Sequence, residues 1–252
     1  MKFFLFCFFT SIAHAHFDAK TSLLARSYPG IGSSLALDIG YNFSLYGQKE
    51  NILYYGLLRP SIIHYESIVV RDTQYKLSFY PLKNIEFSYG KQEYLSHYEK
   101  FSYYDCDEVR CTGTMSKNYS RVQLALGAKH IFITGSYTYY RNKYSYKENL
   151  DDLPVAEYDY GLMTNPKKEV QVRRAYISGI NFENKRLGII FQEDQFLESD
   201  TFSQMRIFFL ENSWNKLKVT NAIGDFESSH QEKNFIYIFK LSWIFEKSEN
   251  MI

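Results

Sequence analysis

After its first fifteen positions the sequence lacks any run of about eighteen consecutive apolar residues, the length that an α-helix needs to cross a bilayer. A membrane-spanning helix is therefore not expected there. A strong charge of either sign is also missing, because 29 basic and 28 acidic residues leave a formal net charge of +1. This balance gives no indication of a nucleic-acid partner. Aromatic residues, in contrast, are abundant: they make up 18% of the chain and include 23 tyrosines.

The first fifteen residues have the pattern of a secretory signal peptide. Lys2 precedes a short apolar run over residues 3–9, and the small residues Ala13 and Ala15 mark a cleavage site. A membrane anchor or a buried helix is the alternative, but about a dozen apolar residues are too few to span hydrocarbon. We expect cleavage after Ala15, which leaves residues 16–252 as a single exported domain.

In the stretch 33–46, apolar side chains alternate with small or polar ones from residue 34 to residue 45. A period of two over about fourteen residues is long for a soluble sheet, where strands usually have about five or six, but it suits a tilted strand in a bilayer. The apolar set is Leu35, Leu37, Ile39, Tyr41, Phe43 and Leu45, and the other face carries Ser34, Ala36, Asp38, Gly40, Asn42 and Ser44.

Similar alternation recurs at 85–90, 121–127, 187–192, 217–224 and 235–245. The sequence therefore predicts an all-β protein, a closed antiparallel transmembrane β-barrel, because closure pairs every backbone group within lipid. A soluble sandwich is the alternative, and it would need shorter strands with turns about every eight to twelve residues.

The joins between strands predict the strand number. Short joins are expected at 47–50, 81–84, 128–130, 181–185 and 211–215, and longer ones at 95–116, 142–167, 197–201 and 225–234. Periplasmic turns are short and outer loops long in such barrels, and strand numbers are even. These rules require an outer turn at 28–32 and a first strand near 17–27, although that strand is weakly patterned. The prediction is twelve strands, with ten as the alternative.

The final strand resembles the C-terminal signature of bacterial outer-membrane proteins. Its aromatic residues stand at alternate positions and end at Phe245, but residues 246–252 follow where that family usually ends. The resemblance covers the architecture of the whole exported chain and is not specific to one barrel family. It implies a place in the bacterial outer membrane, in contact with membrane lipid and lipopolysaccharide.

The inward face of the predicted barrel leans basic. Fixed cations on a wall concentrate anions, which favours a narrow pore for small or anionic solutes. An equal alternative is that the cations pair with acids and tyrosine hydroxyls to fill a closed interior, blocked by Phe132, Tyr140, Phe208, Leu210, Ile236 and Ile238. The predicted inward cations are Lys76, Arg121, Arg173, Arg186, Arg206, Lys216, Lys218 and Lys240, against Asp38, Glu86 and Asp194.

A basic lumen in a twelve-stranded barrel is similar to that of the small acidic-oligosaccharide porins. The similarity is one of architecture and charge, and no motif of that family can be matched residue by residue. Nucleoside channels with the same strand number stay an alternative. No binding residue is therefore carried over.

Arg173 and Arg174 are adjacent, so one of them must face lipid. At the bilayer midplane an outward arginine would cost about 2 to 4 kcal/mol. We expect this strand to begin above the hydrocarbon, with Arg174 among the outer headgroups, where lipopolysaccharide phosphates lie.

Cys106 and Cys111 lie five positions apart in a predicted outer loop. In an oxidising compartment a disulfide is expected, and such a short ring would shape the loop tip. A metal pair is the alternative, but no nearby histidine or second cysteine pair completes a ligand set. The sequence predicts no cofactor and no metal site.

Two other functions stay open. A closed structural or binding barrel would use the loops 95–116 and 142–167 to contact a protein partner outside the cell. A hydrolase acting on lipid or peptide at the rim is less favoured, since it needs a base beside a nucleophile or an activated water. Its candidate residues are His64, His97 and His230 with Ser67, Ser96, Asp105, Asp107, Asp151 and Asp152.

Overall fold

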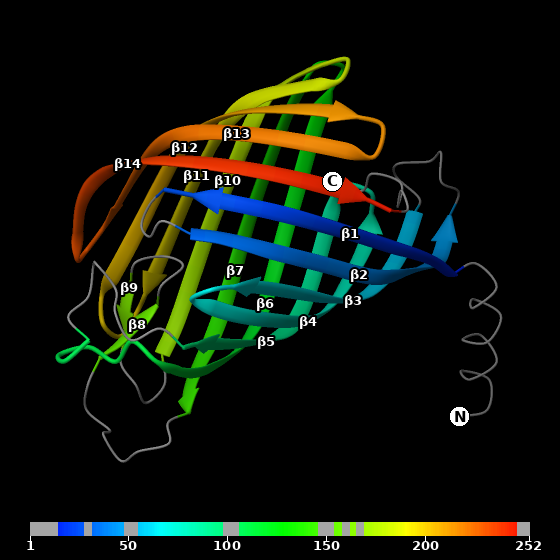
Figure 1. Cartoon of the computed structure of the whole chain (residues 1–252). Coiled ribbons are helices and arrows are strands. Elements are labelled where there is room, and N and C mark those ends of the chain that lie inside the picture. The colour runs from blue at the N-terminus through cyan, green and yellow to red at the C-terminus, as the bar shows by residue number, and fades with distance from the viewer. Residues whose placement is uncertain are drawn as a thin grey trace, which may run out of the picture.

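The structure is a computed structural model, and it describes residues 15–27, 32–47, 55–97, 106–145, 154–157, 162–164 and 169–245. Twelve long antiparallel strands close into a barrel, and two short strands form a separate hairpin (Figure 1). The barrel strands are β1 (Ala15–Arg26), β2 (Gly32–Gly47), β3 (Tyr55–Ser67), β4 (Val70–Leu82), β5 (Ile85–Ser96), β6 (Gly113–Ala128), β7 (Ile131–Ser145), β10 (Glu169–Phe182), β11 (Lys185–Phe196), β12 (Thr201–Trp214), β13 (Leu217–Ser228) and β14 (Gln231–Ile244). The short strands are β8 (Val155–Glu157) and β9 (Leu162–Thr164).

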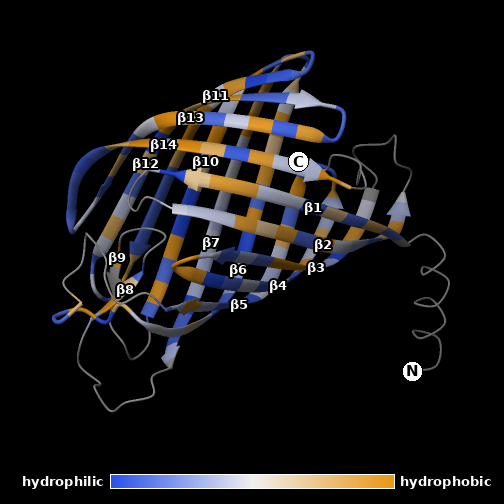
Figure 2. Cartoon of the chain, viewed as in Figure 1, coloured by the Kyte–Doolittle hydropathy of each residue, from blue (hydrophilic) through white to orange (hydrophobic). Residues whose placement is uncertain are grey.

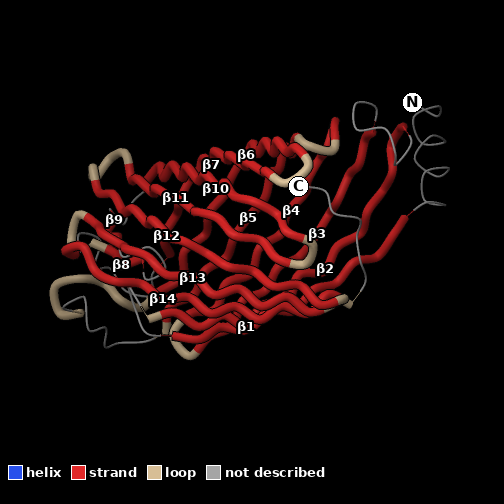
Figure 3. Tube along the Cα trace, turned by 90° about the horizontal axis from the view of Figure 1, so that it is seen from above, coloured by secondary structure: helices blue, strands red, loops and turns tan. Residues whose placement is uncertain are grey.

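The barrel closes where the first strand meets the last. β1 pairs with β2 on one side and with β14 on the other, with Lys20 opposite Ile244 and Arg26 opposite Ile238. Figure 1 shows these two strands, blue and red, side by side, and Figure 3 shows the strands running obliquely around the barrel. The structure confirms the closed barrel and twelve strands rather than ten. Residues 1–14 of the predicted signal peptide lie outside the described residues, and Ala15 is the first residue of β1.

Two outer turns differ from the sequence-based expectation. The sequence did not indicate the turn between β3 and β4, because this turn contains neither glycine nor proline. In the structure the Ser67 hydroxyl accepts a hydrogen bond from the backbone N–H of Val70 at 2.9 Å. The predicted loop 225–234 is mostly strand, with a turn at Ser229 and His230. Charged residues on the outward face of β13 and β14 give this segment the composition of a loop.

The outward face of the barrel is apolar along most of its length. Leu35, Tyr89, Ile189 and Phe235 are each more than half exposed, as expected for side chains that face lipid rather than protein. Figure 2 shows apolar and polar residues alternating along the strands. Among the described residues there is no helix long and apolar enough to span a bilayer.

A belt of ion pairs lies on the outward face toward the outer ends of the strands. Arg174 contacts Glu193 at 3.1 Å, and its strand continues below with the outward residues Tyr176, Ile180 and Phe182. Arg174 therefore faces outward with an acid beside it, and its place among the outer headgroups stays a prediction. Other pairs of this belt are Arg71 with Glu66, Lys91 with Glu93, and Arg206 with Glu227.

An apolar cluster fills part of the interior along β7 and β10–β14. Phe132 and Phe209 lie 6.5 Å apart between ring centroids although β10 and β11 separate their strands. Gly179 and Gly188 occupy the intervening positions of the same row, where an added Cβ would lie 2.9 Å from the rings of Phe132 and Phe209 respectively. The cluster contains Phe132, Ile207, Phe209, Ala222, Phe226 and Ile236, with Ile177, Ile190, Met205 and Ile238 packed against it.

Candidate functional site

The barrel encloses a cavity of about 390 Å³ beside β1–β7 and β10. This volume lies within the range of about 300 to 1,000 Å³ that small-molecule sites occupy. The residues that line this cavity show which face of each strand points inward, because they stand at every second position along a strand. They are Leu24, Arg26, Ser34, Ile63, Tyr65, Ser67, Val70, Asp72, Gln74, Lys76, Ser88, Gln92, Tyr119, Arg121, Thr138, Tyr140 and Arg173.

Strand pairing extends this inward face around the barrel. Residues directly opposite each other on neighbouring strands share a face, so the register assigns each charged side chain to the lumen or to lipid. The inward cations are Lys20, Arg26, Arg59, Lys76, Lys117, Arg121, Arg173, Arg186, Lys218 and Lys240. The inward acids of the strands are Asp18, Asp38, Asp72, Glu86, Glu169, Asp194 and Glu211.

Most of the inward acids are already paired with cations. Arg59 donates to Asp18 at 2.6 Å and to Asp38 at 2.9 Å. Lys76 contacts Glu86 at 2.6 Å, while Arg173 contacts Asp194 at 2.8 Å. These ion pairs agree in part with the alternative stated above, in which inward cations and acids neutralise one another.

Arg121 differs from these cations. Its guanidinium makes a hydrogen bond to Gln123, but within the described part of the chain no carboxylate lies within 4.0 Å of it. Its Nε is buried without a hydrogen-bond partner. Because Arg121 also lines the cavity, it presents to a solute there a guanidinium that no described carboxylate contacts.

A second basic group lies on the strands around the seam of the barrel. Lys20, Lys218 and Lys240 face inward and are close enough to one another to interact electrostatically. Glu211 approaches Lys218 at 3.7 Å and Arg186 at 3.8 Å, so one carboxylate serves several cations.

Two of the predicted lumen residues lie elsewhere. Arg206 is on the outward face of β12, where it contacts Glu227 at 3.0 Å and Asp225 at 3.8 Å. Lys216 lies in the turn before β13 and its Nζ donates to the carbonyl of Phe245 at 3.0 Å. The placement of both residues in the lumen was therefore wrong, whereas Lys76, Arg121, Arg173, Lys218 and Lys240 do face inward.

The error at Arg206 shifted its whole strand by one position. Phe208 and Leu210 point outward, and their neighbours Ile207 and Phe209 point inward. Both faces of this strand are apolar in its middle, so alternation does not assign its register. Of the other predicted blocking residues, Phe132, Tyr140 and Ile236 are inward and buried, and Ile238 is inward and half-buried.

Sequence reasoning missed Asp18, Arg59 and Lys117 as lumen residues. Lys117 could have been found by extending the alternation of Arg121 backwards through Tyr119. Asp18 and Arg59 lie on strands whose patterns are weak, so no comparable signal marked them.

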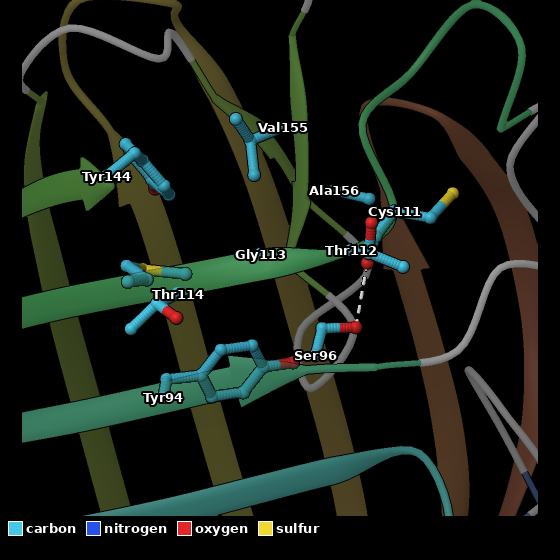
Figure 4. A pocket seen from close by; sticks show the side chains of 10 residues that line it. Tyr94, Ser96, Cys111, Thr112, Gly113, Thr114, Tyr144, Val155 and Ala156 are labelled. Atoms are coloured by element: carbon cyan, nitrogen blue, oxygen red, sulfur yellow. Dashed lines mark hydrogen bonds between the residues drawn. The ribbon is translucent and has the colours of Figure 1, made fainter. Parts of the chain in front are cut away.

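The two long outer loops meet at the mouth of the barrel. A disulfide joins Cys106 and Cys111, as predicted, and Arg110 between them forms a bridge with Val155 of β8. Figure 4 shows this junction, where the Ser96 hydroxyl donates to the carbonyl of Cys111 at 2.7 Å. β8 is buried along its length, and β9 lies against β12. We call β8 and β9 together the mouth hairpin.

Among the described residues, the predicted rim histidine His64 contacts Thr73 and Glu66, neither of which the sequence had singled out. His64 lies on the outward face, with its Nδ1 2.9 Å from the Thr73 hydroxyl and its Nε2 3.3 Å from Glu66. Asp105, Asp151 and Asp152 lie outside the described residues. In the described ranges no group of three or more His, Cys, Asp or Glu side chains is arranged to hold a metal ion.

Neither a family model nor a curated protein matches the chain. Solved structures are similar in fold. One, described as "Unveiling the Mechanism Behind the in-meso Crystallization of Membrane Proteins", has a TM-score of 0.51 at 11% identity over 92% of this chain and 86% of its own. A KdgM porin has a TM-score of 0.48 at 10% identity, over 91% and 99% of the two chains. A loop-deleted OmpT of Vibrio cholerae has a TM-score of 0.42 at 8% identity, over 92% and 99%.

The outward apolar band and the belt of ion pairs place the barrel in a membrane, with its wall in contact with lipid. An even-numbered, closed, antiparallel barrel is the architecture of bacterial outer-membrane proteins. The chain is accordingly an outer-membrane β-barrel.

Proposed function

We propose that this barrel is a narrow pore that favours small anionic solutes. The observation that carries the proposal is the cavity of about 390 Å³ with Arg121 on its wall, a half-buried cation with no carboxylate within 4.0 Å among the described residues. In a site with low-dielectric walls such a charge raises the local concentration of anions and repels cations.

The remaining inward charges support the same direction. Inward cations outnumber inward acids on the described strands, and Lys20, Lys218 and Lys240 share few acidic neighbours. A solute that leaves the cavity near Arg121 would therefore meet a second positive region near the seam. The pairs at Arg59, Lys76 and Arg173 reduce this field, so the selectivity we expect is mild.

The test is conductance of the purified protein in planar bilayers. Under a potassium chloride gradient the reversal potential should show preference for chloride. A barrel that gives no channel, or one that prefers potassium, would contradict the proposal and favour the structural or binding barrel. The chain should also be processed after Ala15, which N-terminal sequencing of the membrane protein checks.

A second candidate, hydrolysis of lipid at the rim, is favoured by one contact. The ring of His64 lies 2.9 Å from the Thr73 hydroxyl, so a base stands beside a possible nucleophile at the outer end of the lipid-facing surface. Release of fatty acid from phospholipid vesicles, abolished in both His64→Ala and Thr73→Val, would support this activity. If the unmodified protein released no fatty acid, this second candidate function would be contradicted.

A further inference from the structure

A deeply buried ion pair joins the barrel wall to the mouth hairpin. Lys117 on the inward face of β6 contacts Glu157 at the end of β8, and both side chains are 1% exposed. A lysine buried to this degree needs an anion beside it, because an isolated buried ammonium is far more costly than a paired one. Here that anion comes from a loop rather than from a neighbouring strand.

Residues of the barrel wall also surround Lys117. Its Nζ lies 5.9 Å and 5.7 Å from the ring centroids of Tyr94 and Tyr140, and 3.3 Å from the amide oxygen of Gln171. Gln171 is fixed in turn, since its amide nitrogen donates to Asp194 at 3.0 Å. The wall thus holds the lysine in one orientation, flanked by aromatic faces and an amide oxygen.

The mouth hairpin is held by contacts that are separate from this ion pair. The Arg110 N–H donates to the Pro154 carbonyl at 2.8 Å, and the Ala156 N–H donates to the Arg110 carbonyl at 3.0 Å. Cys106 and Cys111 pack with Ala156, while Val155 packs with Tyr94, Met115 and Tyr144. The disulfide loop therefore positions the hairpin, and the side chain of Glu157 enters the polar interior.

We propose that Lys117 is a carboxylate-binding subsite of the lumen, and that Glu157 occupies it when the mouth hairpin is closed. A solute carboxylate of the same chemistry competes with Glu157 for Lys117 and so favours displacement of the hairpin. This inference rests on the proposed pore function for its biological meaning. Its physical content, competition at one lysine, can be measured without conductance.

The experiment follows the exposure of the hairpin by thiol labelling of Leu162→Cys, a position on β9 that is fully buried. Folded protein in detergent is treated with a maleimide, to which the bridged Cys106 and Cys111 do not react. Glu157→Gln keeps the shape of the side chain and removes its charge, so the labelling rate should rise about tenfold. Glu193→Gln, an acid paired with Arg174 on the outward face, is the matched control and should not change the rate.

Sodium acetate is the probe for the subsite itself. In the Leu162→Cys protein, acetate should raise the labelling rate with saturation, whereas sodium chloride at equal ionic strength should not. Lys117→Gln should label fast and independently of acetate. The proposed subsite would be contradicted if acetate and chloride changed the labelling rate equally. It would also be contradicted if Glu157→Gln labelled no faster than the Glu193→Gln control. Loss of conductance with these labelling results intact would instead remove only the pore function.

Discussion

The guanidinium of Arg59 reaches the carboxylate of Asp18 at 2.6 Å across an intervening strand, and it does so over Gly40. Gly40 lies opposite Asp18 on one side and Ser61 on the other, so any side chain there would occupy the path of the arginine. An added Cβ would lie 2.7 Å from the Arg59 Cζ. This crossing links the three strands β1, β2 and β3 through one buried charge pair.

Gly40→Ala should destabilise the barrel by about 1 to 3 kcal/mol, because displaced Arg59 leaves the buried Asp18 carboxylate with an incomplete set of donors. The measurement is the free energy of unfolding in urea, with the protein refolded in lipid vesicles. Gly127→Ala is the control, since the nearest heavy atom to its added Cβ would be 3.5 Å away, an ordinary contact. Equal stability of the two variants would show that the crossing contributes little.

Arg121→Gln should lower the ratio of chloride to potassium permeability about fivefold, since a nearby unit charge contributes about 1 kcal/mol even when water screens it. Reversal potentials under a salt gradient provide the measurement. Arg206→Gln removes an arginine from the outward face and should leave the ratio unchanged. If Arg206→Gln lowered the permeability ratio more than Arg121→Gln, the result would contradict both the strand register and the proposed anion selectivity.

The preference for anions should depend on ionic strength. The Debye length falls from about 30 Å at 0.01 M to about 3 Å at 1 M, so the charges of Arg121 and the seam lysines lose their reach at high salt. Permeability ratios measured over this range should approach the free-solution mobility ratio. A ratio that stays constant would mean that pore size rather than charge selects the solute.

Phe209→Ala should cost about 3 to 5 kcal/mol of stability because Phe209 is buried in the interior cluster and its removal leaves a cavity. Phe208→Ala changes the same residue type one position earlier, on the lipid face, where bilayer chains can fill the space. Its cost should be clearly smaller. Urea unfolding of both variants would decide between the observed register of β12 and the one that the sequence suggested.

Alternation was a reliable guide where the two faces of a strand differ in chemistry. In β2 the lipid face is apolar and the lumen face is small or polar, and in β14 aromatic residues at alternate positions mark the lipid face, so both strands were placed correctly from sequence. The even-number rule supplied β1, which has little pattern of its own. The disulfide at Cys106 and Cys111 followed from spacing and compartment.

Alternation was not informative where both faces carry similar residues, or where a strand leaves the hydrocarbon. Ile207, Phe208 and Phe209 are apolar on both sides, because the interior near them is apolar too. Arg206 tolerates an outward position because acids beside it neutralise its charge above the apolar band. The contact of Glu157 with Lys117 joins positions forty residues apart and depends on how a loop folds back, which no local pattern records.

The pairing of β1 with β14 has a consequence for how the chain enters its membrane. These two strands lie at opposite ends of the described sequence, so the ring is incomplete until the last strand is in place. Any earlier assembly has two free edges whose N–H and C=O groups hydrocarbon cannot satisfy. Insertion must therefore be coupled to ring completion, or another sheet must cover those edges while the polypeptide is still being threaded.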